Sequence, residues 1–443
     1  MGKLSAGREL ALRACAQVRE RDAYVDNVVN SMIHRAKMPH EDRAFAELLA
    51  TGVTQTLGTL DEIIDRNLNH PNDIDAEVRD ALRISVYELV FLGKQAHAVA
   101  DQGVELVKLV APRAAGLGNK VLRRIIDDTR AFPWGNPNTD DEALARKTGF
   151  PYWLGDLLVE ELGHDAAVVF MATSNQPAPM YLAVNQIKAK PAEVLQALND
   201  SGAGASFVGP EERGCILVTD QRAAIRSGVL SGGKALVSDA SAQLTALVAT
   251  PRKGGRFLEV GSGRGTKTVM LQSNALVRDG EQARVWCVDK HEFKKEVLAK
   301  RAADYGLENV HVLAGDATDL DSIAELPKTF DGILIDAPCS GLGTLRRNHD
   351  IRWRLEAADI DAMAEVQLAM LKSAAPRVAP GGFIVYSTCT VTSEENGDVI
   401  KRFLASEEGK AFALAKIGGR EAVMGMLRPG GPDVHFMAKL VRK

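Results

Sequence analysis

The sequence after Val237 constrains the fold more than any other feature, because short apolar runs alternate there with helical or loop segments. Each run is rich in Val, Ile and Phe and has the length of a single strand. The runs are RFLEV (256–260), RVWCVD (284–289), VHVLAGD (310–316), FDGILID (330–336) and GGFIVYSTC (381–389). Strands that alternate with helices predict a parallel sheet in a Rossmann-like, doubly wound α/β fold.

Polar and potentially catalytic residues follow most of these runs. In a doubly wound fold, ligands bind beyond the carboxyl ends of the parallel strands. The sequence therefore predicts that the chemistry takes place at one edge of the sheet. The strand ends in question are Glu259–Lys267, Asp289, Asp316, Asp336–Cys339 and Thr388–Cys389.

A glycine-rich loop, LEVGSGRGTKT, follows the first of these runs, and its glycines allow the backbone to turn tightly and approach a ligand closely. The loop alone fits NAD, FAD or S-adenosylmethionine, and it does not complete a phosphate-binding P-loop. Acids at three successive strand ends favour an adenosine ligand, although helix N-capping is the alternative for Asp289 and Asp316. The predicted cofactor-binding residues are Gly261, Ser262, Gly263, Arg264, Gly265, Thr266, Lys267, Asp289, Asp316 and Asp336.

Two cysteines stand directly after the fourth and fifth runs, Cys339 in ILIDAPCSG and Cys389 in VYSTCT. If these strands are neighbours, about 4.8 Å apart, both thiols face one pocket. A buried hydrophobic role is the alternative for either cysteine alone. A thiolate that adds to carbon 6 of cytosine makes carbon 5 nucleophilic toward a sulfonium methyl group. We therefore expect methyl transfer from S-adenosylmethionine, with Asp336 at the ring nitrogen and Lys267 as the cation that favours the thiolate.

The rest of the chain divides into two further regions. Residues up to about 126 repeat apolar positions at helical spacing, as in DRAFAELLATGVTQTLGTLDEIIDRNL, and predict an all-α bundle. The turn-forming stretch FPWGNPNTDD ends the bundle. Beyond it, the helical PYWLGDLLVEELG and the strand-like PMYLAVN and CILVTD predict a small α+β unit. We expect domains at residues 1–132, 141–237 and 238–443.

Composition limits the classes of protein that need to be considered. The chain has 443 residues and a net charge of -4, so any contact with RNA must come from local basic patches. No apolar run approaches the roughly 20 residues of a membrane span, and the N-terminus lacks an apolar signal core. The five cysteines are far apart and never form CxxC, which disfavours disulfides and zinc. We expect a cytoplasmic monomer with no metal and no membrane partner.

The stretches DAPCSGLGTLRRNHDIRW and STCT resemble the Sun/RsmB family of RNA 5-methylcytosine methyltransferases. The resemblance extends to GLGNKVLRRI, PYWLGDLLVEELG and VSDASAQ, and so covers nearly the whole chain. It implies a NusB-like RNA-binding bundle at 1–132, a small RNA-binding subdomain at 141–237 and the S-adenosylmethionine-dependent catalytic domain at 238–443. It also implies that Cys389 attacks carbon 6 and that Cys339 assists release. The implied substrate is small-subunit (16S) ribosomal RNA, free or in a partly assembled subunit.

The sequence departs from the family pattern in one loop and at one single position. The family usually carries Pro-Gly-Gly-Lys in the cofactor loop, where this chain has Arg264-Gly265-Thr266-Lys267. The family also tends to carry Arg where this chain has Ala183. Neither departure touches the cysteines or the acids at the strand ends.

A basic, aromatic segment follows Cys339 and surrounds His349 and Trp353. Arginines interleaved with an aromatic ring suit a phosphate track with stacking beside a target base, although a solvated face is the alternative. The predicted RNA-binding residues are Arg346, Arg347 and Arg352.

Two other function classes remain open from the sequence. The helical bundle suits an RNA-binding assembly or antitermination factor whose methyltransferase domain is inactive. The glycine loop alone suits a nicotinamide-dependent oxidoreductase, which leaves both cysteines unexplained.

Overall fold

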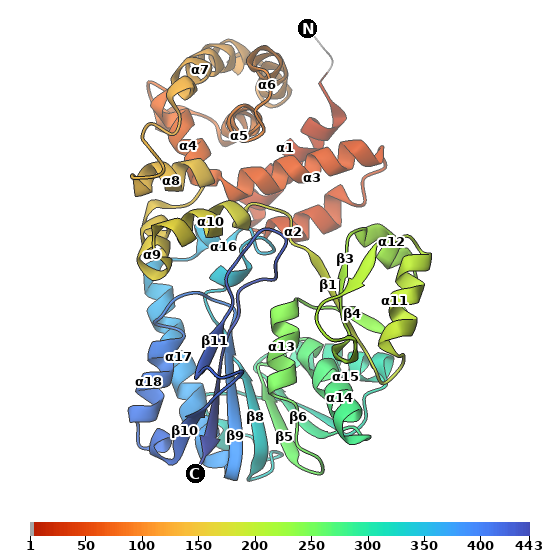
Figure 1. The fold of residues 1–443 in the computed structure, drawn as a ribbon. Helices are drawn as coiled ribbons and strands as arrows, with labels where there is room; N and C mark the ends of the chain where they lie inside the picture. Colours follow the sequence, from red (N-terminus) through yellow and green to blue (C-terminus); the bar gives the residue numbers. More distant parts are fainter. Residues whose placement is uncertain (1–3) are drawn as a thin grey trace. The chain divides into compact units, whose positions relative to one another are not determined.

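The computed structural model describes residues 4–443, which cluster into two compact units (Figure 1). Unit 1 comprises the residues up to Gln176 together with Leu345–Leu355, and unit 2 comprises Pro177–Thr344 and Glu356–Lys443. Among the helices of the described residues, none is long and apolar enough to cross a membrane.

Unit 2 is built on a large mixed sheet whose strand order is β10-β12-β9-β8-β5-β6-β7, with β11 paired to β12. The strands β7, β6, β5, β8 and β9 are parallel, whereas β12 runs antiparallel to β9. The strands are β5 (Arg256–Val260), β6 (Arg284–Asp289), β7 (Val310–Ala314), β8 (Phe330–Asp336), β9 (Val378–Thr388), β10 (Phe412–Ala415), β11 (Ala422–Met424) and β12 (Phe436–Arg442). Each of the five predicted runs forms a strand, and the predicted doubly wound fold is confirmed.

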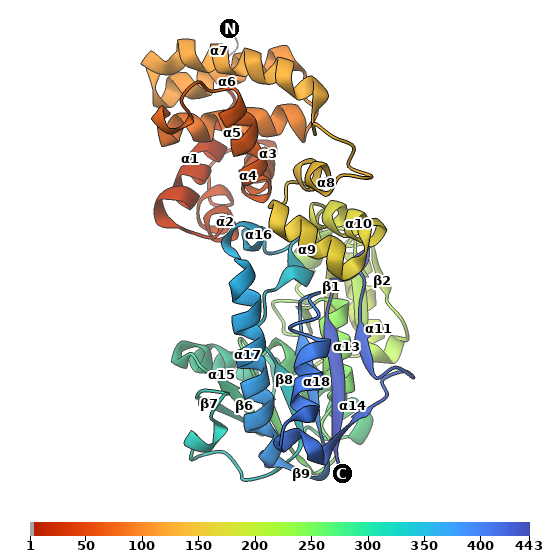
Figure 2. The same ribbon diagram turned by 90° about the vertical axis from the view of Figure 1, so that its left-hand side faces the viewer.

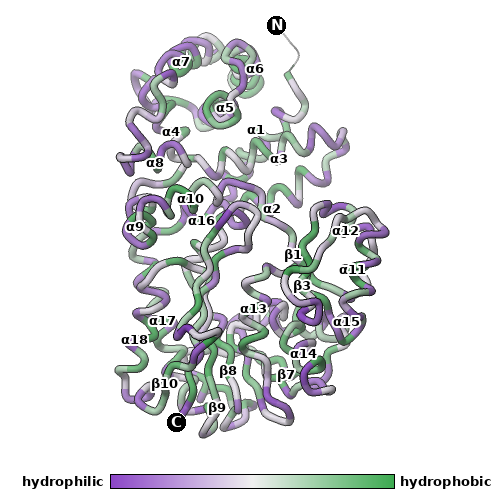
Figure 3. Tube along the Cα trace, in the orientation of Figure 1, coloured by the Kyte–Doolittle hydropathy of each residue, from purple (hydrophilic) through white to green (hydrophobic). Residues whose placement is uncertain are grey.

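Helices cover both faces of this sheet (Figures 1 and 2). The helices are α13 (Ala240–Val248), α14 (Thr266–Asp279), α15 (Glu292–Tyr305), α17 (Ala357–Ala374) and α18 (Gly397–Ala405). Leu368 of α17 and Phe403 of α18 pack with Tyr386 in one core, while Leu271 of α14 and Leu298 of α15 pack on the opposite face. The strands between the two layers are buried on both sides, which explains their nearly continuous apolar sequence (Figure 3).

A smaller antiparallel sheet of order β2-β3-β1-β4 forms the other part of unit 2. Its elements are β1 (Met180–Val184), α11 (Pro191–Asp200), β2 (Ala205–Phe207), β3 (Cys215–Val218), α12 (Gln221–Arg226) and β4 (Ala235–Val237). The stretches PMYLAVN and CILVTD contain β1 and β3, as the sequence indicates.

Unit 1 is helical. Its helices are α1 (Ala6–Arg21), α2 (Val25–Val28), α3 (His40–Gln55), α4 (Leu57–Arg66), α5 (Ala76–Val90), α6 (Ala96–Val110), α7 (Ala115–Asp128), α8 (Asp141–Thr148), α9 (Tyr152–Leu162), α10 (His164–Ser174) and α16 (Ile351–Arg354). Apolar side chains of α1 and α3 to α7 form one continuous core, which explains their helical periodicity. Helices α8 to α10 cluster with unit 1, so the region expected as one α+β unit is divided between the two units.

The segment Leu345–Leu355, from the second half of the chain, is built into unit 1. Arg352 is fully buried, and its Nη1 donates to Gln55 O (3.3 Å), Gly149 O (3.4 Å) and Asn175 Oδ1 (2.9 Å). The guanidinium also stacks 4.1 Å from the ring centroid of Phe150. Burial lowers the pKa of Arg352 to about 9. Arg352 therefore joins the helices of unit 1 through hydrogen bonds to their ends.

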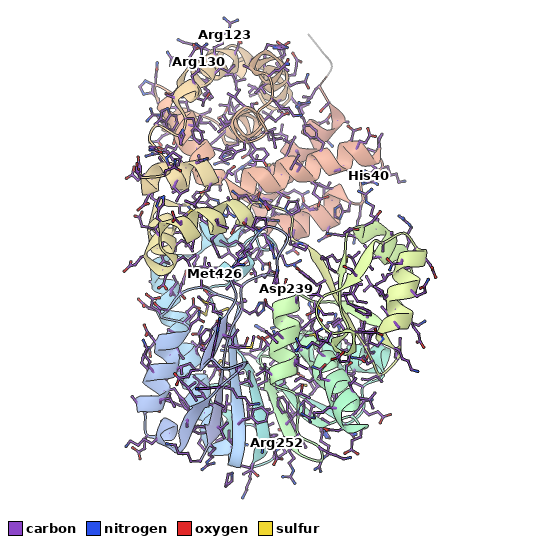
Figure 4. All side chains as sticks on the ribbon, in the orientation of Figure 1. His40, Arg123, Arg130, Asp239, Arg252 and Met426 are labelled. Carbon is purple, nitrogen blue, oxygen red and sulfur yellow. The ribbon has the colours of Figure 1, made fainter. Side chains whose placement is uncertain are left out.

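The first prediction concerns this arginine. Arg352→Ala leaves buried carbonyl groups without their donor, and each such loss costs about 1–3 kcal/mol. We expect the free energy of unfolding of unit 1 to fall by about 2–4 kcal/mol in calorimetry. The control is Arg123→Ala, at an exposed position of α7 (Figure 4), which should change it by less than about 0.5 kcal/mol. Equal stability of the two variants would contradict the prediction.

Candidate active site

The two cysteines meet at the carboxyl ends of neighbouring strands. Strand β8 pairs in parallel with β9, and Asp336 lies opposite Ser387. The Sγ atoms of Cys339 and Cys389 are 3.3 Å apart, and Cys389 N donates to Cys339 Sγ at 3.2 Å. The expectation that these strands are neighbours is confirmed, because the doubly wound topology brings positions 50 residues apart to one edge.

A buried carboxylate fixes the loops that carry both cysteines. Glu395 is fully buried and accepts hydrogen bonds from Ser340 N (2.8 Å) after Cys339 and from Thr392 Oγ1 (2.8 Å) after Cys389. It also accepts one from Gln367 Nε2 of α17 (3.1 Å). Sequence reasoning missed Glu395, because an acid in the polar stretch VTSEEN has the pattern of a solvated loop.

The thiols lie beside a partly buried ion pair. Lys267 Nζ is 2.7 Å from Asp336 Oδ2. Burial opposes the charged ammonium, but the attraction of Asp336 outweighs it and raises the pKa of Lys267, with a further contribution from Cys389. The hydrogen bond with Cys389, together with burial, holds the pKa of the Cys339 thiol well above its ordinary value. At neutral pH the site thus contains an ammonium cation and a protonated Cys339.

His435 is a further site residue that sequence reasoning missed. It precedes Phe436 of β12, which pairs with Thr388 directly before Cys389. Burial, followed by the nearby charge of Lys267, lowers the pKa of His435 to about 4, so its imidazole is neutral at pH 7. The one sequence signal was a polar residue at the start of the apolar run VHFMAKL.

A cavity of about 440 Å³ opens beside the ion pair at the ends of β5, β6 and β8. Gly261 has a φ of +77°, and a Cβ there would lie 2.2 Å from Asp336 O, so only glycine allows the loop to pass this close to β8. Gly263 N donates to Asp289 Oδ2 at 3.0 Å. The lining residues include Gly261, Gly263, Val288, Asp289, Asp316, Asp336, Pro338 and Met370.

The acids that follow β6 and β7 border this cavity. Asp289 binds Lys294 Nζ at 3.0 Å and accepts from His291 N at 3.1 Å. Asp316 Oδ1 accepts from the hydroxyl (2.7 Å) and the amide (2.9 Å) of Thr318, and these bonds lower the pKa of Asp316. Asp316 is therefore an ionised acceptor at neutral pH, and the side chain of Asp289 accepts hydrogen bonds at the edge of the same cavity.

The remaining predicted cofactor residues have other positions. Ser262 is buried in the loop, Arg264 is exposed, and Thr266 Oγ1 accepts from Arg301 Nη1 at 2.8 Å. Gly265 precedes α14 with a φ of +78°. These residues shape the loop and are not among the residues that line the cavity.

The predicted RNA-binding arginines are not among the residues that line the cavity. Arg346, Arg347 and Arg352 lie in the segment that clusters with unit 1. Arg346 and Arg352 are buried, and Arg347 is half-buried. In this structure Arg352 is a packing residue, because its guanidinium is sealed among backbone carbonyls and Phe150 instead of being offered to a phosphate.

Glu259 lies fully buried at the end of β5, beneath the glycine loop. Its Oε2 accepts from Thr268 Oγ1 at 2.6 Å. Burial, with the nearby Asp336 adding to it, raises the pKa of Glu259 to about 7. The folded protein therefore holds this proton more tightly than the unfolded chain.

The second prediction follows from that pKa. A raised carboxyl pKa destabilises the folded state as pH rises from about 4.5 toward about 7. Glu259→Gln keeps the acceptor for Thr268 and removes the titration. Its stability relative to the parent should rise by about 2–3 kcal/mol between pH 5 and pH 8, measured by urea unfolding with hydrogen exchange in β5. Glu296→Gln, at an exposed position of α15, is the control. A pH-independent difference for Glu259→Gln would refute the assignment.

Family models match three parts of the chain. Residues 246–429 match the 16S rRNA methyltransferase RsmB/F model, residues 5–127 match the NusB family, and residues 150–222 match the RsmF/B-like ferredoxin-like domain. The crystal structure of PH0851 shares the fold, with a TM-score of 0.78 and 22% identity over 99% of this chain and 100% of that chain. A methyltransferase homolog protein from Pyrococcus horikoshii shares it over 68% of this chain and 97% of that one, with a TM-score of 0.58 and 22% identity.

Curated relatives match over nearly the full length. A "Probable ribosomal RNA small subunit methyltransferase B" from Synechocystis sp. is 30% identical over 91% of this chain and 90% of its own. The ribosomal RNA small subunit methyltransferase B of Salmonella dublin is 29% identical, with 100% of both chains covered. The resemblance seen in the sequence is thereby confirmed, and the chain belongs to the RsmB/F family of 16S rRNA methyltransferases.

Proposed function

We propose that this chain transfers a methyl group from S-adenosylmethionine to carbon 5 of a cytosine in small-subunit ribosomal RNA through a covalent cysteine adduct. The observation that carries the proposal is the pair of thiols 3.3 Å apart beside the ion pair of Lys267 and Asp336. The names of the curated relatives support the choice of ribosomal RNA.

The cavity beside β5, β6 and β8 fits S-adenosylmethionine. Its glycine backbone admits a ligand at close range, and its acids supply acceptors for hydroxyl and amino groups. In this proposal Asp289 holds the ribose hydroxyls, Asp316 binds the adenine edge, and Gly261 and Gly263 cradle the ligand. When bound there, S-adenosylmethionine supplies an electrophilic methyl group next to the thiols.

Cys389 is the nucleophile in this proposal. Lys267 stabilises its thiolate in this proposal, because a cation favours a neighbouring anion in a partly enclosed site. The thiolate adds to carbon 6 of the cytosine, and the electron density moves to carbon 5. Asp336 contacts the ring nitrogen, where a proton or hydrogen bond stabilises the adduct. Carbon 5 then takes the methyl group.

Cys339 assists the collapse of the adduct. Its raised pKa keeps it a thiol, and its Sγ lies within hydrogen-bond distance of Cys389 Sγ. An S–H donor at this position stabilises the departing sulfur of Cys389 when the bond to carbon 6 breaks. The two cysteines therefore act in different steps.

The third prediction separates these two roles. Cys389→Ala should abolish methyl transfer and form no covalent RNA complex. Cys339→Ala should still attack, so a methylated protein–RNA adduct should accumulate on a denaturing gel with 16S rRNA and S-adenosylmethionine. Cys215→Ala, a buried cysteine of β3, is the control and should behave as the parent does. Accumulation by Cys389→Ala instead would reverse the roles, and full turnover by both variants would refute the covalent mechanism.

The fourth prediction tests the cofactor site. Asp289→Ala removes the side-chain oxygens that accept from the ribose in this proposal, and a hydrogen bond to a charged group contributes about 1.5–3 kcal/mol. We expect the affinity for S-adenosylmethionine to fall by about tenfold or more in calorimetry. Asp361→Ala, at an exposed position of α17, is the control. Unchanged affinity in Asp289→Ala would remove Asp289 from the site.

A further inference from the structure

His435 lies at the end of the strand that pairs with the strand carrying the proposed nucleophile. Phe436 of β12 lies opposite Thr388 of β9 at the end of this antiparallel pairing. His435 and Cys389 are the next residue of each chain segment beyond that pair. Directly opposite residues of an antiparallel pair project from the same face of a sheet. That face is turned toward α13, because Ser387 Oγ lies 3.5 Å from Thr245 Oγ1 and Lys439 Nζ donates to Val248 O. His435 and Cys389 thus both adjoin the end of the β9–β12 pair at the catalytic edge.

One ring nitrogen of His435, Nδ1, is buried and makes no hydrogen bond within residues 4–443. The residue as a whole is only 8% exposed. A buried polar atom without a partner is costly, so it requires an explanation, and a catalytic role is one such explanation. Its ring is neutral at pH 7, since burial comes first and Lys267 second in lowering its pKa.

Four charged groups act electrostatically on this imidazole. Lys267 disfavours the imidazolium, whereas Asp336, Asp239 and Asp433 favour it. Asp239, labelled in Figure 4, caps α13 and accepts from Asp433 N at 3.0 Å, which ties the loop before β12 to that helix. The imidazole is therefore held in place on a supported loop, next to the ion pair of the active site.

The chemistry requires a proton acceptor on the side of the nucleophile. The thiolate and the sulfonium methyl group approach opposite faces of the cytosine ring, since both cannot occupy one face. The hydrogen on carbon 5 is then displaced toward the face that carries the cysteine. Cys339 lies on this side, but its raised pKa leaves it protonated and unable to accept a further proton.

We propose, as an extension that rests on the function proposed above, that His435 accepts the proton from carbon 5 of the methylated cytosine adduct. The C5–H bond breaks, and its electron pair forms the C5=C6 double bond. The bond between carbon 6 and Cys389 Sγ breaks, and its electron pair stays on sulfur. The proton moves to a ring nitrogen of His435. Lys267 and burial disfavour the resulting imidazolium, so His435 releases the proton to solvent. The imidazole is then neutral again, and Cys389 is again the thiolate that began the cycle.

The fifth prediction follows the two labels of one turnover. The full-length protein is mixed with 16S rRNA that carries tritium at carbon 5 of cytidine and with methyl-labelled S-adenosylmethionine. In His435→Gln, the methyl label should enter the covalent adduct within about threefold of the parent rate. Tritium release should fall by about 100-fold, the typical contribution of a general base, and the methylated adduct should accumulate. In His435→Ala, added imidazole should restore tritium release.

Controls separate a proton-transfer role from a structural one. His311→Gln, at an exposed position of β7, should release tritium as the parent does. Tritium release within about threefold of the parent in His435→Gln, or a parallel loss of methyl entry and tritium release, would overturn the inference. Imidazole that fails to rescue His435→Ala would overturn it as well. If the parent protein forms no adduct, the function proposed above fails instead, whatever His435→Gln does.

Discussion

The catalytic edge of unit 2 depends on one buried carboxylate. Glu395 receives hydrogen bonds from the loop after β8, from the loop after β9 and from α17, and so holds both cysteine loops in one geometry. A buried acid is stable only when such donors satisfy it. The distance of 3.3 Å between Cys339 Sγ and Cys389 Sγ is a consequence of that network. The two small thiol side chains keep their relative positions because this polar cluster holds the loops that carry them.

Charge placement explains how neighbouring groups of the site take different protonation states. The ion pair keeps Lys267 charged, the contact with Cys389 keeps Cys339 protonated, and burial beside Lys267 keeps His435 neutral. Covalent catalysis at a pyrimidine needs a nucleophile, a donor for the departing sulfur and an acceptor for the ring proton. Lys267 therefore contributes to two of the three proposed roles, and the contact between the two cysteines sets the third.

The chain crosses between the two units more than once, so the units are not simply consecutive along the sequence. Unit 2 is interrupted by Leu345–Leu355, which belongs to unit 1. Arg352 anchors this segment through buried carbonyl groups, while Cys339 lies only a short stretch of chain before it. Arginines that the sequence presents as a basic surface are consequently part of a packed interior.

The sequence by itself determined the doubly wound fold, the strand ends that carry chemistry, the paired cysteines and the glycine loop, because these depend on local periodicity and on short motifs. Only the tertiary structure decided which polar residues are buried. Glu395 and His435 belong to no motif in the sequence. Hydrogen bonds hold Glu395 against both cysteine loops, and strand pairing places His435 next to the end of the β9–β12 pair. Arg352 has the pattern of a surface cation, yet packing encloses it. Burial and the distances between remote segments are collective properties of the fold, so no local pattern contains them.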